Sequence, residues 1–397
     1  MYSRARYARC TLPRRTGLDR KLFFTYLEEP KMAISASDKV RVGIIGCGGI
    51  ANGKHMPSLR NIANVEMVAF CDIIVEKAEK AAKDFGTPDA KVYENYKELL
   101  EDKSIDVVHV CTPNRAHSFI TVDALEAGKH VMCEKPMAIN SEEAMKMLDA
   151  AKRTGKKLTI GYQNRQNSPA QYMKAEADKG TFGDMYLGTA HAIRRRAVPT
   201  WGVFLNEYEQ GGGPLIDIGT HALDLTLWTM NNYKPKYAVG TTYHKLNNQT
   251  NSANAWGDWD PAQFTVEDSA FGFVVMENGA TIRVESSWAL NVAESREACC
   301  TIAGTLGGAD YHGGLRLNGV RDGRQYTTQI DFGSGGVAFF DGNPNEDSGT
   351  KEARQWIRAV MDDKDPCVLP EQALCVTRIL EAIYKSAETG DIVFLNK

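Results

Sequence analysis

The sequence predicts an α/β Rossmann domain followed by a second α+β domain built on a large, open, mostly antiparallel sheet. Two observations support this fold class. Between residues 40 and 163, six short apolar runs alternate with segments of helical periodicity, as in a doubly wound parallel sheet. After residue 165 the strand-like segments are longer and alternate in polarity, and the turn signal "MENGAT" joins two of them, which is typical of antiparallel strands.

Length and composition are those of a two-domain globular protein. The chain has 397 residues, 43% hydrophobic and 24% charged. A net charge of −3 gives no reason to expect nucleic acid or an anionic membrane as a partner, and no apolar run reaches the ~18 residues that cross a bilayer. The nine cysteines include no CxxC pair and no metal-type spacing with histidine. We therefore expect no metal site and a reducing, cytoplasmic compartment.

The first 31 residues differ from the rest of the chain. They are Arg-rich and superficially resemble an organellar transit peptide. A second explanation is preferred, because the segment ends "LEEPKM" and consecutive Glu codons can spell a purine-rich ribosome-binding sequence just before Met32. We expect Met32 to be the native start and residues 1–38 to lie outside the fold.

The first domain is expected at residues 39–165. The stretch "VRVGIIG" is a continuous apolar run rich in β-branched residues, which is typical of a strand buried on both faces. The predicted strands are 40–46, 65–72, 91–93, 105–113, 130–136 and 157–163. A helix-like segment follows the first strand, and further helices are predicted at 75–85, 95–102, 116–128 and 141–155.

The second domain is expected at residues 166–397. It begins with a helix at 169–180, and the predicted strand regions are 185–196, 237–246, 269–290, 298–319 and 323–333. Two helices, at 351–363 and 370–390, close the chain and are expected to pack back on the Rossmann domain. Residues 245–262 form the longest irregular loop, and it contains Trp256 and Trp259.

The stretch "VGIIGCGGIA" places Gly46, Gly48 and Ala51 directly after the first strand and at the start of a helix. The first glycine permits a tight turn, the second lets backbone N–H groups approach a pyrophosphate, and the small third residue lets helix and strand pack. The second strand ends in Asp72, about 20 residues further on. An acid there accepts hydrogen bonds from a ribose diol and repels a 2′-phosphate, so NAD is predicted over NADP. A purely structural glycine turn is the alternative.

A second stretch, "GGGPLIDIGTHALDL" (211–225), carries Asp217, His221 and Asp224. Their spacing of i, i+4 and i+7 puts them on one face of an expected helix. The surrounding residues are apolar, and burying an acid and a histidine without partners is costly. A helix start explains Asp217 alone, so structural and functional roles are equally open from this stretch. Asp224 fits a structural role better than a catalytic one.

At "CTPNRAH" (111–117), "CEKP" (133–136) and "GGGPLIDIGTHALD" (211–224) the sequence resembles the glucose–fructose oxidoreductase / inositol dehydrogenase (Gfo/Idh/MocA) family. The resemblance extends from residue 40 to about residue 395. It implies an NAD(P)-dependent oxidoreductase that acts on a sugar, a polyol or a related compound. It also implies that the sheet of the second domain is used for oligomerisation.

The same resemblance implies the site residues. Lys135 corresponds to the lysine of the Glu-Lys-Pro motif, and Asp217 and His221 correspond to the later acid and histidine, so these three form the expected catalytic set. Arg165 matches an arginine often found after the sixth strand and is expected to bind substrate together with them. The expected cofactor-binding residues are Gly46, Gly48, Gly49, Ile50, Asp72, Thr112, Pro113, Asn114, His117, Glu134, Lys135, Arg165 and Trp201.

These residue types suit the oxidation of a secondary alcohol, which loses a hydride from carbon and a proton from oxygen. His221 can take the proton because the ordinary pKa of histidine lies near the working pH, and Asp217 could hold its tautomer or stabilise its charged form. Lys135 follows the fifth strand, at the edge where doubly wound sheets bind ligands, and its ammonium can stabilise a developing alkoxide. The glycines at 211–213 are expected to let the backbone approach the nicotinamide.

Two segments are not features of the whole family. They are the tract "HAIRRRAVPTWG" (191–202) and the loop at 245–262, and we expect substrate specificity to reside there. Trp201, Trp256 and Trp259 can stack on a sugar ring or serve as core or oligomer contacts.

We therefore expect an NAD-dependent enzyme that oxidises a secondary hydroxyl of a sugar, glycoside or polyol, with C3 of a glucoside as the narrower hypothesis. Two alternatives stay open. One is a redox-neutral, glycoside-cleaving enzyme that retains its NAD. The other is a non-catalytic NAD- or sugar-binding regulator, against which the intact Lys135, Asp217 and His221 argue. A homo-oligomer, either a dimer or a tetramer, is expected through the second sheet.

Overall fold

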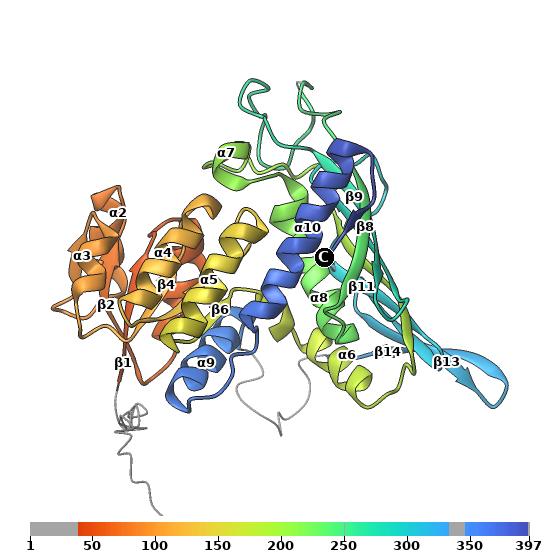
Figure 1. Cartoon of the computed structure of the whole chain (residues 1–397), viewed down its shortest axis with the longest axis horizontal. Coiled ribbons are helices and arrows are strands. Elements are labelled where there is room, and N and C mark those ends of the chain that lie inside the picture. Colours follow the sequence, from red (N-terminus) through yellow and green to blue (C-terminus); the bar gives the residue numbers. More distant parts are fainter. Residues whose placement is uncertain (1–38, 250, 333–345, 396–397) are drawn as a thin grey trace, which may run out of the picture. The chain divides into compact units, whose positions relative to one another are not determined.

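The computed structural model describes residues 39–249, 251–332 and 346–395. The extension at residues 1–38, and with it the start-site hypothesis, lies outside these ranges. Within them the chain forms a six-stranded sheet and a nine-stranded sheet, each covered by helices (Figure 1). The first is parallel and the second mostly antiparallel, so the predicted fold class is confirmed.

The six-stranded sheet has the order β3-β2-β1-β4-β5-β6, and every neighbouring pair is parallel. Its strands are β1 (Val40–Ile45), β2 (Val65–Cys71), β3 (Lys91–Tyr93), β4 (Val107–Val110), β5 (His130–Cys133) and β6 (Leu158–Ile160). The strand predicted at 105–113 ends at Val110. Pro113 explains the early end, because it has no N–H for the sheet and its fixed φ suits the start of the next helix.

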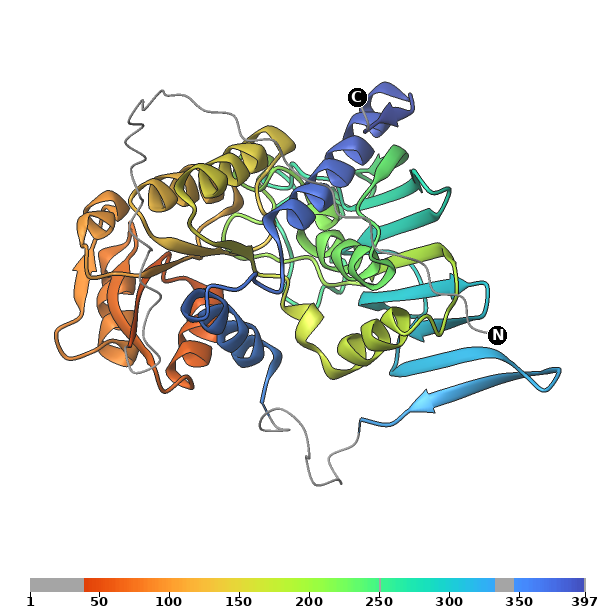
Figure 2. The same ribbon diagram turned by 60° about the horizontal axis from the view of Figure 1, so that its bottom comes forward.

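Helices cover both faces of this sheet (Figure 2). The helices α4 (Asn114–Glu126) and α5 (Ser141–Thr154) pack together on one face. The other face carries the π-helical turn η1 (Ala51–His55), α1 (Met56–Arg60) and α9 (Ser348–Met361), which reaches it from near the carboxyl terminus. Two further helices, α2 (Val75–Phe85) and α3 (Tyr96–Glu101), lie beside β2 and β3.

Local signals explain where these helices begin and end, as α5 illustrates. The side chain of Asn140 accepts a hydrogen bond from the Glu143 N–H at 2.9 Å, which caps the amino end. Met147 and Leu148 belong to the buried, apolar face of the helix. Gly155 ends it in the left-handed region, at a φ of 65°, which glycine adopts without strain.

The nine-stranded sheet has the order β14-β13-β12-β11-β7-β10-β9-β8-β15. Its strands are β7 (Met185–Ile193), β8 (Pro235–Tyr243), β9 (Ser269–Met276), β10 (Thr281–Ser287), β11 (Arg296–Gly304), β12 (Gly307–Tyr311), β13 (Leu315–Arg321), β14 (Arg324–Ile330) and β15 (Val393–Phe394). Neighbours are antiparallel with one exception, the parallel pair of β7 and β10. This pair places the carboxyl ends of β7 and β10 side by side.

Helices cover one face of the second sheet. The helix α8 (Thr220–Met230) contacts β7 and β11, α10 (Pro370–Thr389) contacts β8 and β9, and α6 (Ser168–Asp178) packs on α8 (Figure 1). Three short elements complete this part: the 3₁₀ turn η2 (Gln163–Gln166), α7 (Glu207–Gln210) and the π-helical turn η3 (Leu215–Gly219). Among the described residues, no helix combines the length and apolarity that a membrane span requires.

A buried ion pair lies where η2, α8 and the start of α10 meet. Arg165 donates to both carboxylate oxygens of Asp224, at 2.9 and 2.5 Å, to the Cys367 carbonyl at 2.9 Å and to Gln372 Oε1 at 2.7 Å. Its remaining donor lies 3.4 Å from the hydroxyl of Tyr233. All of its N–H groups are thus engaged within the protein, which does not fit the role in binding cofactor or substrate that the sequence suggested. Asp224 has the structural role that was expected.

Replacing Arg165 with methionine is expected to lower the free energy of unfolding by about 3–5 kcal/mol, because the buried carboxylate of Asp224 is left without its partner. Urea denaturation measures the loss. The double variant Arg165→Met/Asp224→Leu is the control and should recover much of the stability, since it removes both charges. A single variant as stable as the parent would contradict a structural role for this pair.

Candidate active site

The glycine-rich turn lies at the carboxyl edge of the first sheet. Gly46 has a φ of 91°, and a Cβ there would lie 2.6 Å from the carbonyl oxygen of Cys111, so the position requires glycine. At Gly48 and Gly49 a Cβ would meet no described atom within 4 Å. Open space therefore lies beside the amino end of η1, where Ile50 is the exposed cap residue. Such a turn at a helix start fits the pyrophosphate of a dinucleotide.

Asp72 directly follows β2, and backbone donors hold its carboxylate. The Cys47 N–H donates to Oδ2 at 2.8 Å, and the Ile74 N–H donates to Oδ1 at 2.9 Å. Each oxygen keeps a second lone pair that can accept from a ribose diol. Asp72 thus fixes the glycine turn while retaining the acceptors that NAD requires.

The segment from Thr112 to His117 joins β4 to α4. The Thr112 hydroxyl is buried and has no hydrogen-bond partner within the described ranges, so it can serve a bound group. Pro113 caps α4, and Asn114 Nδ2 donates to the Gln210 carbonyl of α7 at 3.0 Å. The ring nitrogens of His117 lie 2.7 Å from the Pro136 carbonyl oxygen and 2.9 Å from that of Thr112. His117 therefore ties two loops of this edge together.

An ion pair joins this edge to the second half of the chain. Lys135, after β5, places Nζ 2.8 Å from Asp217 Oδ1 and 2.9 Å from the Asp217 carbonyl oxygen. Trp288 Nε1, just after β10, donates to Asp217 Oδ2 at 3.0 Å. Burial opposes ionisation of Asp217, but the charge and hydrogen bond of Lys135 outweigh it and lower the pKa of this carboxyl group. Asp217 is therefore ionised at neutral pH.

His221 lies in the first turn of α8, just after the π-helical turn that carries Asp217. Burial lowers its pKa to about 3, and the positive charge of Lys135 adds to the shift. The imidazole is thus uncharged at neutral pH. Its Nδ1 is buried without a hydrogen-bond partner among the residues described, and its ring meets Tyr162 edge-on at 6.2 Å. Asp217 directs both oxygens to Lys135 and Trp288, so the expected support of His221 by Asp217 remains a prediction.

A cluster of buried charges lies next to this pair, and the sequence did not reveal it. Glu134 Oε1 accepts hydrogen bonds from Lys54 Nζ and, at 2.7 Å, from His55 Nε2. Glu134 Oε2 accepts the Lys135 N–H at 3.0 Å, so it fixes the backbone that presents Lys135. Burial opposes ionisation of Glu134, but Lys54 and His55 outweigh it and hold its pKa well below the usual value. The expected contact of Glu134 with the cofactor competes with these three donors.

Glu352 of α9 shares the ammonium of Lys54 with Glu134, at 3.1 Å. One cation cannot neutralise two buried carboxylates equally, and burial raises the pKa of Glu352 to about 7. The sequence contains one sign of this cluster of buried charges. In the stretch "GKHMP" (53–57), a lysine and a histidine closely follow the glycine-rich turn. Their partner on α9 comes from about 300 residues away, a distance over which a local pattern carries no information.

The three glycines before Asp217 are needed for packing within the protein. A Cβ at Gly212 would lie 2.2 Å from the Tyr384 hydroxyl oxygen, and one at Gly213 would lie 2.2 Å from the Glu267 carbonyl oxygen. The Glu267 carboxylate accepts from the Gly213 N–H at 2.8 Å, the Leu215 N–H at 3.1 Å and the Tyr384 hydroxyl at 2.8 Å. The expected approach of this backbone to the nicotinamide thus has a second, structural explanation.

Trp201 lies on the loop after β7. It is 51% exposed and packs edge-on against Trp256 and Phe204, with ring centroids 4.9 and 5.8 Å away. Its expected contact with the cofactor stays a prediction. Gly46, Asp72, Thr112 and Lys135, by contrast, gather along the carboxyl edge of the first sheet.

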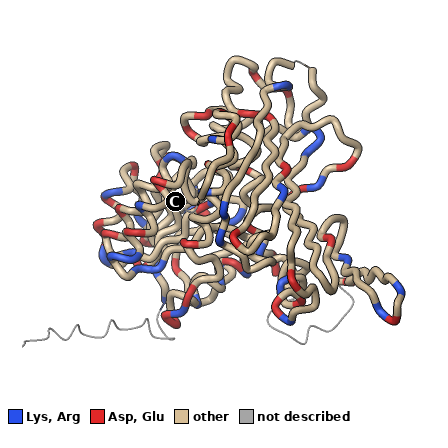
Figure 3. Tube along the Cα trace, turned by 45° about the vertical axis from the view of Figure 1, so that its right-hand side comes forward, with Lys and Arg blue, Asp and Glu red and all other residues tan. Residues whose placement is uncertain are grey.

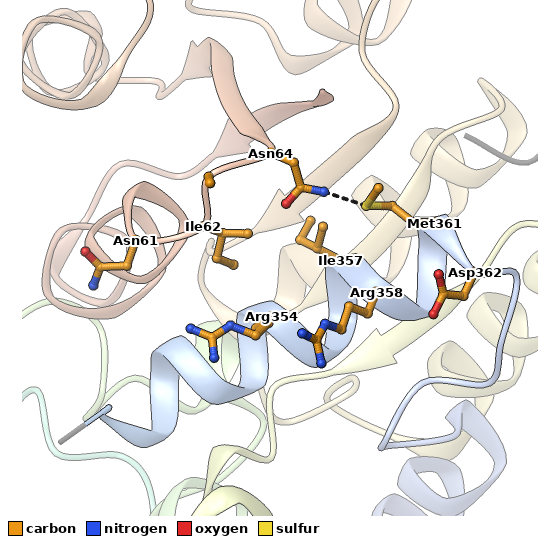
Figure 4. A pocket seen from close by; sticks show the side chains of 9 residues that line it. Asn61, Ile62, Asn64, Arg354, Ile357, Arg358, Met361 and Asp362 are labelled. Atoms are coloured by element: carbon orange, nitrogen blue, oxygen red, sulfur yellow. Dashed lines mark hydrogen bonds between the residues drawn. The ribbon is translucent and has the colours of Figure 1, made fainter. Parts of the chain in front are cut away.

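A separate groove of about 520 Å³ opens near the amino end of β2 (Figure 4). Residues 61–64 line one side, and α9 lines the other with Arg354, Arg358 and Met361. The Arg354 guanidinium is already paired with Glu346, and Asn64 Nδ2 donates to Met361 Sδ at 2.7 Å. None of the predicted site residues lines this groove, so it is distinct from the candidate active site.

Comparison with known proteins follows the same division of the chain. The family model described as "Oxidoreductase family, NAD-binding Rossmann fold" matches residues 40–162, and the one described as "GFO/IDH/MocA C-terminal domain" matches residues 170–310. D-glucoside 3-dehydrogenase of Escherichia coli (strain K12) is 34% identical over 368 residues, which cover 90% of this chain and 98% of that protein.

Two further similarities are more distant. Inositol 2-dehydrogenase of Salmonella typhimurium (strain LT2) is 32% identical over 194 residues, or 48% of this chain and 55% of that protein. The solved structure of levoglucosan dehydrogenase in complex with NADH and levoglucosan superimposes with a TM-score of 0.75 at 21% identity. That match covers 91% of this chain and 100% of the other, and it concerns the fold alone.

Replacing Trp288 with phenylalanine is expected to cost about 1–3 kcal/mol more free energy of unfolding than the same change at Trp356. Both indoles are buried, but only Trp288 donates to a carboxylate, whereas Trp356 Nε1 has no hydrogen-bond partner among the described residues. Urea denaturation of the two variants provides the comparison. Equal losses would show that the hydrogen bond to Asp217 contributes nothing to stability.

Proposed function

Because the chain belongs to the Gfo/Idh/MocA family of NAD-binding oxidoreductases, we propose that it oxidises a secondary hydroxyl of a sugar, glycoside or polyol, and more narrowly the 3-hydroxyl of a glucoside. Its family and relatives make it an NAD-dependent dehydrogenase that acts on CH–OH groups. The carbon that reacts and the roles of the residues belong to the proposal.

One observation carries the proposal: the part-buried ammonium of Lys135 lies within electrostatic reach of the uncharged imidazole of His221. Lys135 Nζ is held by the carboxylate and the carbonyl of Asp217. The charge of Lys135 lies close enough to His221 to help keep that ring neutral. A cation and an uncharged base in the same site are the two groups that alcohol oxidation needs.

Each residue of the proposed site has a separate role. NAD, when bound, supplies the hydride acceptor, and the turn at Gly46 with Asp72 and Thr112 would hold it. Lys135 donates a hydrogen bond to the substrate oxygen and stabilises its negative charge as the proton leaves. His221 is uncharged and can accept that proton, although its pKa of about 3 makes it a weaker base than the sequence predicted. Asp217 and Trp288 keep the ammonium of Lys135 in position.

The narrower substrate rests on similarity along nearly the whole chain. The relative named D-glucoside 3-dehydrogenase aligns over 98% of its length, whereas the inositol dehydrogenase aligns over about half. Only the first of these alignments spans nearly the whole chain, and it therefore includes most of the second sheet as well as the first. A glucoside is therefore favoured over a free polyol.

Purified enzyme is expected to reduce NAD when given methyl β-D-glucopyranoside and to release the 3-ketoglucoside in equal amount. The Lys135→Ala and His221→Ala variants should lose roughly 10²–10⁴-fold in kcat/KM, the usual contribution of a positioned acid or base. NADH absorbance and mass spectrometry of the product give the two readouts. The affinity of each variant for NAD, from calorimetry, should stay close to that of the parent.

Three outcomes separate this function from its alternatives. Full turnover in both variants would refute the assigned roles. Release of methanol without net NADH would indicate redox-neutral glycoside cleavage. Binding of NAD and glucoside with no turnover in the parent would indicate a regulator.

We also propose that the chain forms a homo-oligomer through the uncovered face of the second sheet, in the cytoplasm. Gly240 and Gly272 face α10, so the residues next to them along β8 and β9, Val239 and Phe273, point to the opposite face. Phe273 is 43% exposed there, and clustered exposed apolar side chains are typical of an interface.

Charges of both signs are mixed along the trace (Figure 3). Eight described cysteines are free, which supports a reducing compartment.

Light scattering is expected to give the mass of a dimer or tetramer for the parent, and the Phe273→Asp variant should shift toward the monomer. The added charge would have to be buried in the interface, which is costly. Phe119→Asp is the matched control, since that exposed phenylalanine lies on α4 of the first sheet. A monomeric parent, or equal behaviour of the two variants, would contradict an interface on this face.

A further inference from the structure

Two indole rings stand half in solvent on the loops beyond the second sheet. Trp201 is 51% exposed and Trp256 is 43% exposed, although tryptophan is usually well buried. Their ring centroids lie 4.9 Å apart at an interplanar angle of 82°. The two rings therefore form a corner with two perpendicular apolar faces. We refer to Trp201 and Trp256 as the indole corner.

The loops that carry the indole corner are fastened to each other. Asn254 Oδ1 accepts the Val198 N–H at 2.8 Å, and Asn254 Nδ2 donates to the Val198 carbonyl at 2.9 Å. The Thr200 hydroxyl donates to the carbonyl of Trp256 at 2.7 Å. Phe204 supports the ring of Trp201 from its own loop. The rings are thus held in place while much of their surface stays in water.

A short run of contacts connects the indole corner to the charged pair. Arg194 lies directly after β7, with its guanidinium carbon 5.3 Å from the centre of the Trp256 ring. Its Nη1 donates to the Ala197 carbonyl at 3.2 Å, and the Ala197 N–H donates to the Trp288 carbonyl at 2.9 Å. Trp288 in turn donates to Asp217. The positive charge of Arg194 also contributes to the lowered pKa of Asp217, so the two groups are close.

The loops reach the same side of the molecule as the nucleotide edge. In Figure 1 the green loops that follow β7 and β8 rise beyond α7, and α7 itself contacts α4. Asn114 and Arg115 of α4 donate to carbonyls of α7, at 3.0 and 2.8 Å. A substrate with its reacting hydroxyl at Lys135 can therefore extend toward the indole corner.

We propose that Trp201 and Trp256 form a subsite for the second ring of a glycoside, the aryl or sugar ring joined through the anomeric oxygen. The inference rests on the proposed oxidation of a glucoside at Lys135 and His221, and it names the substrate class of that site. A ring of this kind has an apolar face that packs on indole, and two perpendicular indoles contact it on a face and an edge. Arg194, fixed by Glu297 at 2.7 and 2.5 Å, adds a polar rim.

Phenyl and methyl β-D-glucopyranoside test the subsite, because they differ only in the second ring. The parent should bind the phenyl compound roughly 5- to 10-fold more tightly than the methyl compound, as expected for one well-placed aromatic contact. Trp256→Ala should remove that preference and leave methyl glucoside binding unchanged, and Trp201→Ala should remove the preference as well. Trp256→Phe should restore part of it. Calorimetry on the NAD-loaded protein measures binding, and kcat/KM is measured in parallel.

Tyr186→Ala is the matched control, since that tyrosine is 55% exposed but lies at the far end of β7. No preference for the phenyl compound in the parent, or equal losses for both compounds in the tryptophan variants, would overturn the subsite even if both glucosides are oxidised. A preference that depends on the indoles without any oxidation would leave the subsite standing and refute the proposed function. A change of oligomeric mass in the tryptophan variants would assign the indole corner to an interface and overturn the proposal.

Discussion

The ion pair between Lys135 and Asp217 is the contact on which the rest of the site depends. Both side chains are largely removed from water, and a buried charge without a partner is costly. Lys135 follows β5 of the first sheet and Asp217 lies in η3, between β7 and β8 of the second, so the pair also links the two halves of the chain. Trp288, Glu134 and the loop at 211–213 each act on one member of the pair. A change at any of them is therefore transmitted to the ammonium.

Buried carboxylates around the pair are stabilised in two different ways. Near the first sheet the carboxylates are stabilised by a cation, because Lys54 keeps Glu134 ionised and also forms an ion pair with Glu352. Near the second sheet hydrogen bonds do it, since Glu267 accepts two backbone N–H groups and one hydroxyl. Burial outweighs these bonds and raises the pKa of Glu267 to about 7. Glu134 and Glu352 thus rely on the positive charge of Lys54, whereas Glu267 relies on neutral donors from residues 213–215 and α10.

The sequence predicted the two sheets well because their signals are local. Apolar runs of period two, the turn at Gly46 and the acid at Asp72 each lie within a short stretch. The expected helical stripe of Asp217, His221 and Asp224 was divided by the π-helical turn η3, and Asp224 turned to Arg165. Partners such as Lys54 with Glu352, or Glu267 with Tyr384, are joined only by the fold, and periodicity does not reveal them. The partners of Arg165 were missed for the same reason, since they lie far away in sequence.

The position of the site follows from strand direction in both sheets. In the first sheet the carboxyl ends of parallel strands gather the glycine turn, Thr112 and Lys135 at one edge. In the second sheet, β7 and β10 are parallel, so their carboxyl ends also lie side by side. Ile193 pairs with Ser287, and both strands end at these residues. Arg194 and Trp288 follow at once, beside η3 and Asp217. An antiparallel neighbour would have sent one of these exits to the opposite end of the sheet. One parallel pair in an otherwise antiparallel sheet therefore brings Arg194 and Trp288 to the same end of the sheet, beside Asp217.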